Sequence, residues 1–175
     1  TTGRESVPEI DRWSVGLDLS LSCTGMAAID SNGYLVETAT IKTKSSKGLV
    51  GRIGRFRHIA ASVASFVESY SPCSILIEGY SFGSKGRGIF DIAEAGGIVK
   101  SSLLGLNDHI LSIDEIAPSS LQLQVTGFGG GRGEAKKAAM KRAVEEIYGE
   151  LGYKESDVYD AVGLALISWW RSHSG

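Results

Sequence analysis

A single aspartate interrupts an apolar, small-residue stretch near the start of the chain. The stretch WSVGLDLSLSCTGMAAID, residues 13–30, has the composition of buried structure on both sides of Asp18. Burying a lone carboxylate costs several kcal/mol unless something pairs with it. Asp18 is therefore the acid of this chain that is hardest to explain as an ordinary surface residue.

Three further carboxylates occupy positions from which they could meet Asp18. Glu78 ends a short β-branched strand, SPCSILIEGY, that could be a sheet neighbour of the strand carrying Asp18. Asp157 and Asp160, in SDVYDAVGLALISWW, are three residues apart, so a helix presents both on one face. If that helix packs on the sheet, all of these carboxylates converge.

Converging carboxylates cannot all stay ionised unaided, because each like charge raises the pKa of its neighbours. Divalent cations that prefer oxygen ligands resolve this conflict, and Mg²⁺ is the usual choice beside phosphate. Two such ions, about 3.5–4 Å apart, would clamp the attacking water and the leaving oxygen of an in-line phosphodiester displacement. The acids therefore predict a hydrolytic site whose carboxylates hold metal.

Each acid also has a simpler interpretation when it is taken alone. Asp157 is favourable at a helix N-terminus, Asp160 suits an exposed helix position, and Glu78 suits a strand end that reaches solvent. The joint order and spacing of the acids, rather than any one of them, favour the metal site.

The elements that position these acids follow from the hydrophobic pattern. Residues 13–22 predict a buried strand. GMAAIDSNGYLVETATI predicts a hairpin in which Asn32 and Gly33 supply the positive φ angles of a tight turn. SPCSILIEGY and HILSIDEI predict two more strands, the second ended by APSS. Helices are predicted at Leu49 to Tyr70, at 89–106, at 135–148 closed by Gly149, and from a capping Ser156 to about Trp170.

Three antiparallel strands followed by alternating helices and strands predict an α/β fold, with a mixed five-stranded sheet and helices packed on it. A chain of 175 residues fits one domain. We expect residues 13–172 to form that domain and residues 1–12 to be a disordered N-terminal extension or a remnant of expression. No apolar run approaches the ~18 residues that span a bilayer, and Cys23 and Cys73 suit buried thiols in a reducing compartment. Both features predict a cytoplasmic protein with no membrane partner.

The charges are segregated along the chain, although the net charge is only −2. Residues 38–67 carry six bases and no acid, residues 126–142 carry five bases against Glu134, and the acids gather at 145–160. This distribution favours contact with a polyanion around a metal site. The alternative, that the bases are solvated helix faces, carries about equal weight.

The glycine-rich stretch VTGFGGGRGE leads into the helix at 135–148. Its glycines let backbone N–H groups approach a phosphate. Lys137 and Lys141 follow four residues apart on one helix face, and Lys85 and Arg87 bracket another flexible loop beside Glu78. These positions predict contacts with a nucleic-acid backbone.

At this point the residues resemble a known family. VGLDLSLSCTG, ILIEGYSFG, APSSLQLQVTGFGGGRGEAKK and DVYDAVGLALI are similar to successive motifs of the RuvC-like Holliday junction resolvases, with the greatest similarity to short bacteriophage-encoded members. The resemblance spans residues 13–170. It implies an RNase H-like fold with helices on both faces of the sheet, a homodimer, and paired symmetric nicks in four-way DNA junctions made with Mg²⁺ or Mn²⁺.

The resemblance also assigns residues. Asp18 takes the place of the first-strand aspartate, Glu78 that of the strand-end glutamate, and Asp157 and Asp160 match the final-helix pair. Two ions per active site are implied. Gln122 stands where cellular members commonly have a lysine that contacts phosphate.

The resemblance extends to the DNA-binding residues. Lys136 or Lys137 matches the basic residue that follows the family's glycine loop. Tyr80 and Phe82 compete for the role of an aromatic that wedges against unpaired bases, and packing into the core is an equal alternative for Tyr80. The full set expected at DNA is Tyr80, Phe82, Lys85, Arg87, Arg132, Lys136, Lys137 and Lys141.

Other functions remain open at this stage. GLDLSLSCTG also resembles the first phosphate loop of actin-like ATPases and sugar kinases, but those proteins enclose their nucleotide between two such domains. A less selective branched-DNA or flap nuclease of the same fold is the nearest alternative, and a catalytically silent junction-binding protein is another. The helix at 89–104, with Gly96-Gly97, is the candidate for dimer packing, and core packing within one subunit is its alternative.

Overall fold

A computed structural model describes residues 12–80, 86 and 88–174 of the chain. The N-terminal extension expected at residues 1–12 lies outside the described residues except for Arg12. None of the helices in the described part combines the length and apolar character needed to cross a bilayer.

Five strands form one mixed sheet, as the sequence predicted. The strands are β1 (Trp13–Asp18), β2 (Cys23–Ile29), β3 (Leu35–Lys42), β4 (Cys73–Glu78) and β5 (Ile110–Ile116), in the spatial order β3-β2-β1-β4-β5. The first three pair antiparallel, whereas β1 pairs parallel with β4 and β4 with β5. The carboxyl ends of β1 and β4 therefore meet at one edge of the sheet.

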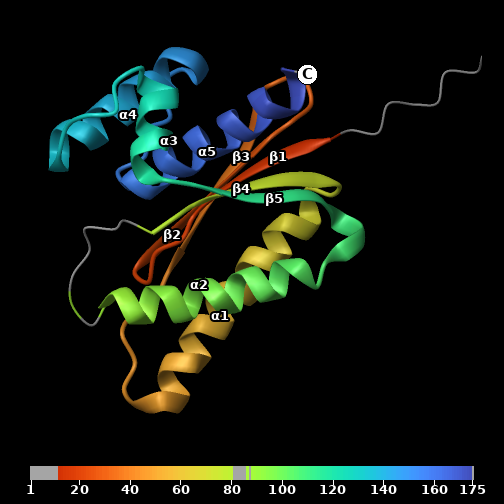
Figure 1. Ribbon diagram of the computed structural model, residues 1–175, viewed down its shortest axis with the longest axis vertical. Helices are drawn as coiled ribbons and strands as arrows, with labels where there is room; N and C mark the ends of the chain where they lie inside the picture. The colour runs from red at the N-terminus through yellow and green to blue at the C-terminus, as the bar shows by residue number, and fades with distance from the viewer. Residues whose placement is uncertain (1–11, 81–85, 87, 175) are drawn as a thin grey trace, which may run out of the picture.

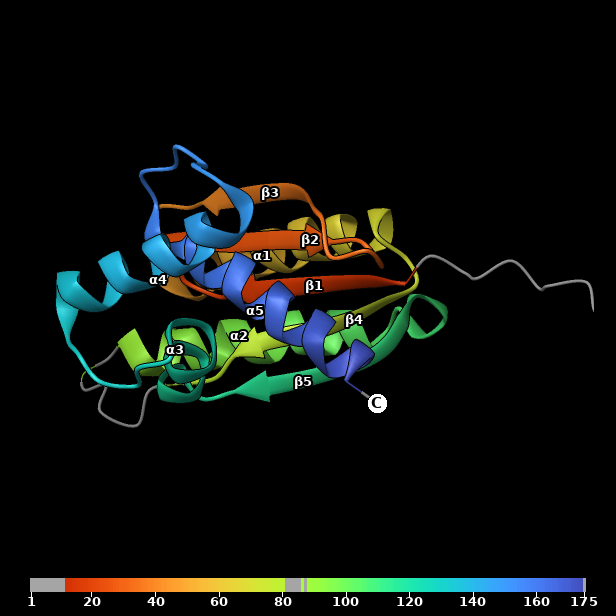
Figure 2. The same ribbon diagram turned by 90° about the horizontal axis from the view of Figure 1, so that it is seen from above.

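Helices cover both faces of this sheet (Figure 1). On one face lie α1 (Gly48–Ser69) and α2 (Gly88–Leu104), and a short 3-10 turn, Asn107–His109, leads from α2 into β5. On the other face lie α3 (Pro118–Thr126), α4 (Gly133–Tyr148) and α5 (Ser156–His173). In Figure 2, α5 runs across β1, the central strand.

Each face of the sheet has its own hydrophobic core, because strand side chains alternate between the two faces. Val15, Leu17 and Ile75 pack with the apolar stripe of α1, whereas Ala27, Ile29 and Leu76 pack with α5. The predicted stripe of α1 is buried from Phe56 onward, at positions 56, 60, 63, 67 and 70. Leu49, its first predicted member, is 64% exposed, because the first turn of α1 extends past the sheet.

The hairpin between β2 and β3 is present, but Asn32 does not have the predicted positive φ angle. Gly33 alone has it, at 87°. The Asp30 side chain accepts hydrogen bonds from the backbone N–H groups of Asn32 and Tyr34, at 2.9 Å each. This Asx-type arrangement makes a left-handed Asn32 unnecessary.

One predicted helix boundary was wrong, and one helix was not predicted. APSS ends β5 as expected, but Pro118 also begins α3 there. Ser156 lies inside α5 rather than capping it, since Glu155 is the N-cap residue, and the helix continues to His173. In α2, Gly96 faces Tyr80 of the same chain, because a Cβ there would lie 2.2 Å from the Tyr80 hydroxyl. Dimer packing through this helix stays a prediction.

Candidate active site

Asp18 and Glu78 end neighbouring parallel strands. Leu17 of β1 pairs with Ile77 of β4, so the next residue of each strand reaches the same edge of the sheet. Asp18 is only 7% exposed, and Glu78 is partly buried. The crevice outside the carboxyl ends of such strands is where open α/β sheets commonly bind ligands.

Helix α5 approaches this edge closely because two strand residues are glycines. A Cβ on Gly16 would lie 2.0 Å from the backbone oxygen of Ala161, and one on Gly25 would lie 2.1 Å from that of Asp157. Gly25 is also the residue that pairs with Asp18 in the β1–β2 ladder. The first turn of α5, which carries Asp157, therefore rests directly on the strand pair that presents Asp18.

The pKa values of Asp18, Glu78 and Asp160 are all raised, first by burial and then by neighbouring carboxylates. Burial raises the pKa of Asp18 well above its ordinary value, and the charges of Glu78, Asp160 and Asp157 raise it further. Burial likewise raises the pKa of Asp160 to about 7, with Glu78 adding to the effect. Burial also raises the pKa of Glu78, although a hydrogen bond from Asp18 opposes this shift.

Lys136 is the base that faces these acids most directly. Its charge opposes the upward shift of the pKa of Glu78 and of Asp160, whereas Lys137 contributes to Asp160 alone and more weakly. Both lysines lie in the first turns of α4, where Lys136 is half-buried and Lys137 exposed. Of the two lysines matched by the resemblance, Lys136 therefore acts on two of the acids and Lys137 on one.

The chemistry of this donor set fits a hard divalent cation. Carboxylate oxygens are the ligands that Mg²⁺ and Mn²⁺ prefer, and a cation would offset the mutual repulsion that raises the pKa values. Within the described residues, however, no three acidic, histidine or cysteine side chains already surround one point as metal ligands. The residues thus fit the ion by their chemistry, and their side chains must adjust to bind it.

Sequence reasoning missed several residues that hold the site. Cys23, the first residue of β2, lies against Asp157, and burial together with that carboxylate raises the pKa of its thiol to about 11. Both cysteines are free, but Cys23 is only partly buried, unlike Cys73. Lys42 forms an ion pair with Glu155, the N-cap residue of α5. The strand glycines alone gave a readable signal, since Gly within a strand often marks a close backbone approach.

Gln122 positions the helix that carries Lys136. Its side chain is 1% exposed, and its amide nitrogen donates to the backbone oxygen of Lys136 at 3.3 Å. The amide oxygen of Gln122 is buried without a hydrogen-bond partner in the described residues. Gln122 thus contacts α4 from within the protein.

The aromatic and basic residues expected at DNA lie in two parts of the chain, one after Glu78 and one along α4. Tyr80 follows Glu78 and is 40% exposed. Its hydroxyl donates to the backbone oxygen of Ala93 at 3.4 Å, and the Lys100 ammonium lies 4.9 Å from its ring centroid. Arg132, Lys137 and Lys141 are exposed along the start of α4. Phe82, Lys85 and Arg87 lie outside the described residues.

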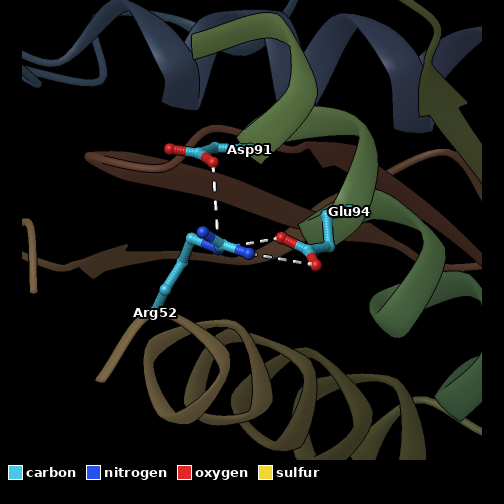
Figure 3. A network of polar contacts seen from close by, with 3 residues as sticks. All are labelled: Arg52, Asp91 and Glu94. Atoms are coloured by element: carbon cyan, nitrogen blue, oxygen red, sulfur yellow. Dashed lines mark hydrogen bonds and ion pairs between the residues drawn. The ribbon is translucent and has the colours of Figure 1, made fainter. Parts of the chain in front are cut away.

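Part of the basic segment at 38–67 is engaged inside the protein. Arg52 of α1 lies between two acids of α2 (Figure 3). Its Nε is 3.0 Å from Glu94 and 3.9 Å from Asp91. Arg55 donates to the backbone oxygen of Leu21 and, at 2.7 Å, to the Thr43 hydroxyl. These two arginines therefore stabilise the fold, a role that differs both from contact with a polyanion and from a solvated helix face.

Comparison with protein families gives one match that spans most of the chain. The family described as crossover junction endodeoxyribonuclease RuvC matches residues 14–168. A curated relative of that name from Burkholderia multivorans is 27% identical over 164 residues, covering 92% of this chain and 83% of its own. Another from Prochlorococcus marinus is 25% identical over 155 residues, covering 87% and 94%.

Solved structures show the same fold. The RuvC structure of Thermus thermophilus superposes with a TM-score of 0.71 at 16% identity, covering 93% of this chain and 96% of that one. The same protein in complex with a Holliday junction substrate gives equal values. The yeast mitochondrial Holliday junction resolvase Ydc2 gives a TM-score of 0.56 at 12% identity, covering 91% and 78%.

Proposed function

Because this chain belongs to the RuvC family of crossover junction endodeoxyribonucleases, we propose that it resolves four-way DNA junctions by metal-dependent hydrolysis of phosphodiester bonds. The observation that supports this most is the meeting of acids distant in sequence. Asp18 and Glu78 end paired parallel strands, and α5 lies on Gly25 beside them.

In the proposed site, Asp18, Glu78, Asp157 and Asp160 hold two Mg²⁺ or Mn²⁺ ions. Bound ions of this kind lower the pKa of water and stabilise charge on both the attacking and leaving oxygens. The carboxylates keep the cations at the sheet edge, and burial of Asp18 keeps bulk water away from its oxygens. Lys136 contributes a fixed positive charge beside Glu78 and Asp160, where the backbone phosphate of a substrate would lie.

The DNA-binding surface in this proposal lies around that site. Tyr80, Phe82, Lys85 and Arg87 follow Glu78 in sequence and would contact the unpaired centre of a junction. Arg132, Lys136, Lys137 and Lys141 would contact phosphates along α4. An aromatic face stacks on any base with a free energy of about 1–3 kcal/mol, so Tyr80 or Phe82 would favour open branch points over intact duplex.

Paired symmetric nicks imply two active sites, and we propose that the protein acts as a homodimer through α2. Gly97 is open in α2: apart from the backbone of its own helix, no atom of the described residues lies within 4 Å of a Cβ placed there. Phe90 and Leu104 of the same helix are 73% and 60% exposed.

Three further expectations stay predictions. They are similarity to the bacteriophage-encoded members, a cytoplasmic location in a bacterium or infected host, and a single domain at 13–172.

A nicking assay on a mobile four-way junction tests the function. With Mg²⁺, the unmodified protein should give paired symmetric nicks, whereas Asp18→Asn and Glu78→Gln should bind the junction without cutting it. Asp108→Asn, an exposed acid in the 3-10 turn, is the matched control and should cut normally. Undiminished cutting by either site variant contradicts the assignment, and equal cutting of flaps and splayed arms favours the less selective nuclease.

A further inference from the structure

A broad groove of about 600 Å³ lies between α4 and the segment that joins α4 to α5. Lys137 and Lys141 line it from α4, Tyr153 and Lys154 line it from the joining segment, and Ser156 lines it from the first turn of α5. In Figure 2 the joining segment stands beside the edge strand β3. A groove of this size is within the range of ligand-binding clefts.

The groove is positively charged. Three of its lining residues are lysines, and Glu134 is the acid that lines it with them. Lys137 lies 4.0 Å from Glu134, whose side chain is 95% exposed. An ion pair so open to solvent is weak, so it leaves the Lys137 ammonium group available to an anion. Lys141 lies 3.9 Å from the less exposed Glu145, and its own side chain is 46% exposed.

The aromatic wall of the groove is held in place by hydrogen bonds. The Tyr153 hydroxyl accepts a hydrogen bond of 2.6 Å from Thr38 of β3, and the Tyr159 hydroxyl donates one of 2.9 Å to Glu145. The two rings meet edge to face, with centroids 6.5 Å apart. Tyr159 is buried, whereas Tyr153 is 39% exposed. Tyr153 therefore offers a fixed ring to the groove at little cost in side-chain entropy.

The groove reaches the first turn of α5, the turn that carries Asp157. Ser156, which lines it, directly precedes Asp157 in the first turn of α5. Lys137 lines the groove and also acts electrostatically on Asp160. If a DNA strand placed one phosphate at the carboxylates, its neighbouring phosphates could therefore contact the lysines of this groove.

We propose that this groove binds the sugar–phosphate backbone of the DNA strand next to the cleaved phosphate, with Lys137, Lys141 and Lys154 contacting phosphates and Tyr153 stacking on an unpaired nucleotide. The inference rests on the proposed function and adds Tyr153 and Lys154 to its DNA-binding surface. A positive groove with an exposed aromatic ring is the usual arrangement for sequence-tolerant binding of a single strand.

Lys154→Ala tests the electrostatic part, in an Asp18→Asn background that leaves DNA intact. Fluorescence anisotropy measures binding of a four-way junction and of a ten-nucleotide oligothymidine over a series of salt concentrations. Lys154→Ala should bind both several-fold more weakly and reduce the salt slope by about one. Arg171→Ala, at the exposed far end of α5, should change neither. An unchanged slope for Lys154→Ala overturns the proposal.

Two tyrosine variants test the stacking part. Tyr153→Phe keeps the ring and loses the acceptor for Thr38, whereas Tyr153→Leu loses the ring. The leucine variant should bind the oligothymidine about five-fold or more weakly, and the phenylalanine variant should bind it normally. Equal losses in both variants overturn the stacking role.

These experiments distinguish failure of the groove proposal from failure of the proposed function. If the unmodified protein nicks junctions while Lys154→Ala binds DNA normally, only the groove proposal fails. Lack of both nicking and preference for a junction over unbranched duplex defeats the proposed function instead. If Lys154→Ala weakens binding of polyglutamate but not of DNA, the groove serves an acidic protein and the proposal is overturned.

Discussion

The backbone carbonyl of Asp157 occupies the space that a side chain on Gly25 would fill. A Cβ at Gly25 would lie 2.1 Å from that oxygen and 2.6 Å from the carbonyl carbon. Gly25 is also the ladder partner of Asp18. One hydrogen atom in place of a side chain thus sets how closely the helix acids approach the strand acid.

Gly25→Ala should therefore impair both folding and catalysis. The added methyl group must push α5 away from β2, and overpacking of this kind costs about 1–3 kcal/mol. The displacement would also move Asp157 away from Asp18, so cleavage should fall while junction binding persists. Urea unfolding and a nicking assay on the same preparation measure the two effects.

Gly54→Ala, in α1, is the control for this prediction. Apart from its own helix backbone, no described atom lies within 4 Å of a Cβ placed there, and alanine is favoured over glycine inside a helix by about 1 kcal/mol. This variant should be as stable as the unmodified protein or slightly more so. A Gly25→Ala protein that unfolds and cuts like the unmodified one would show that α5 can shift without cost.

The strands and long helices could be predicted because their patterns are local. The spacing of Phe56, Val63 and Val67 in α1 is visible in the sequence, and so is the order of the acids. Helix α3 was missed because it is short and polar. Within it only Leu121 and Gln122 are buried, which is too few to give a helical spacing of apolar residues.

The geometry of the site could be predicted only in part. That Asp18 and Glu78 end strands follows from their local sequences, which allow β1 and β4 to be neighbours but do not require it. Gly16 and Gly25 indicate a close approach, but nothing local says that α5 makes it. The contacts of Cys23 with Asp157 and of Lys42 with Glu155 join residues more than a hundred positions apart, so they depend on the completed fold.

Asp160→Asn should stabilise the metal-free protein at alkaline pH. The pKa of Asp160 is raised from 3.8 to about 7, so the folded protein binds this proton more tightly than the unfolded chain does. Its stabilising contribution is complete below about pH 4 and is lost as the pH rises through about 7. At pH 8 the asparagine variant should be more stable by a few kcal/mol.

Urea unfolding in EDTA at pH 8 and at pH 4.5 measures this effect. The advantage of the asparagine variant should be large at pH 8 and small at pH 4.5. The same advantage at both values would mean that the charge of Asp160 is not its source.

Divalent cations should stabilise the protein at pH 8, because they bind the acids of the folded state. An ion at a hundred times its Kd adds about 2.7 kcal/mol. Thermal unfolding with Mg²⁺ or Mn²⁺ against EDTA measures the shift in Tm. Asp18→Asn should lose most of that shift and Asp108→Asn none of it, whereas equal shifts in all three proteins would place the ions elsewhere.

Arg52→Ala and Lys137→Ala should separate bases that hold the fold from bases that bind DNA. Arg52 is paired with Asp91 and Glu94 across α1 and α2. Its removal should lower the free energy of unfolding by up to about 1 kcal/mol and leave the salt slope of junction binding unchanged. The Lys137 side chain is 53% exposed, so its removal should leave stability unchanged and reduce the slope by about one. Junction binding titrated at several salt concentrations measures both slopes, and a reduced slope for Arg52→Ala would mean that this arginine leaves its acids for a phosphate.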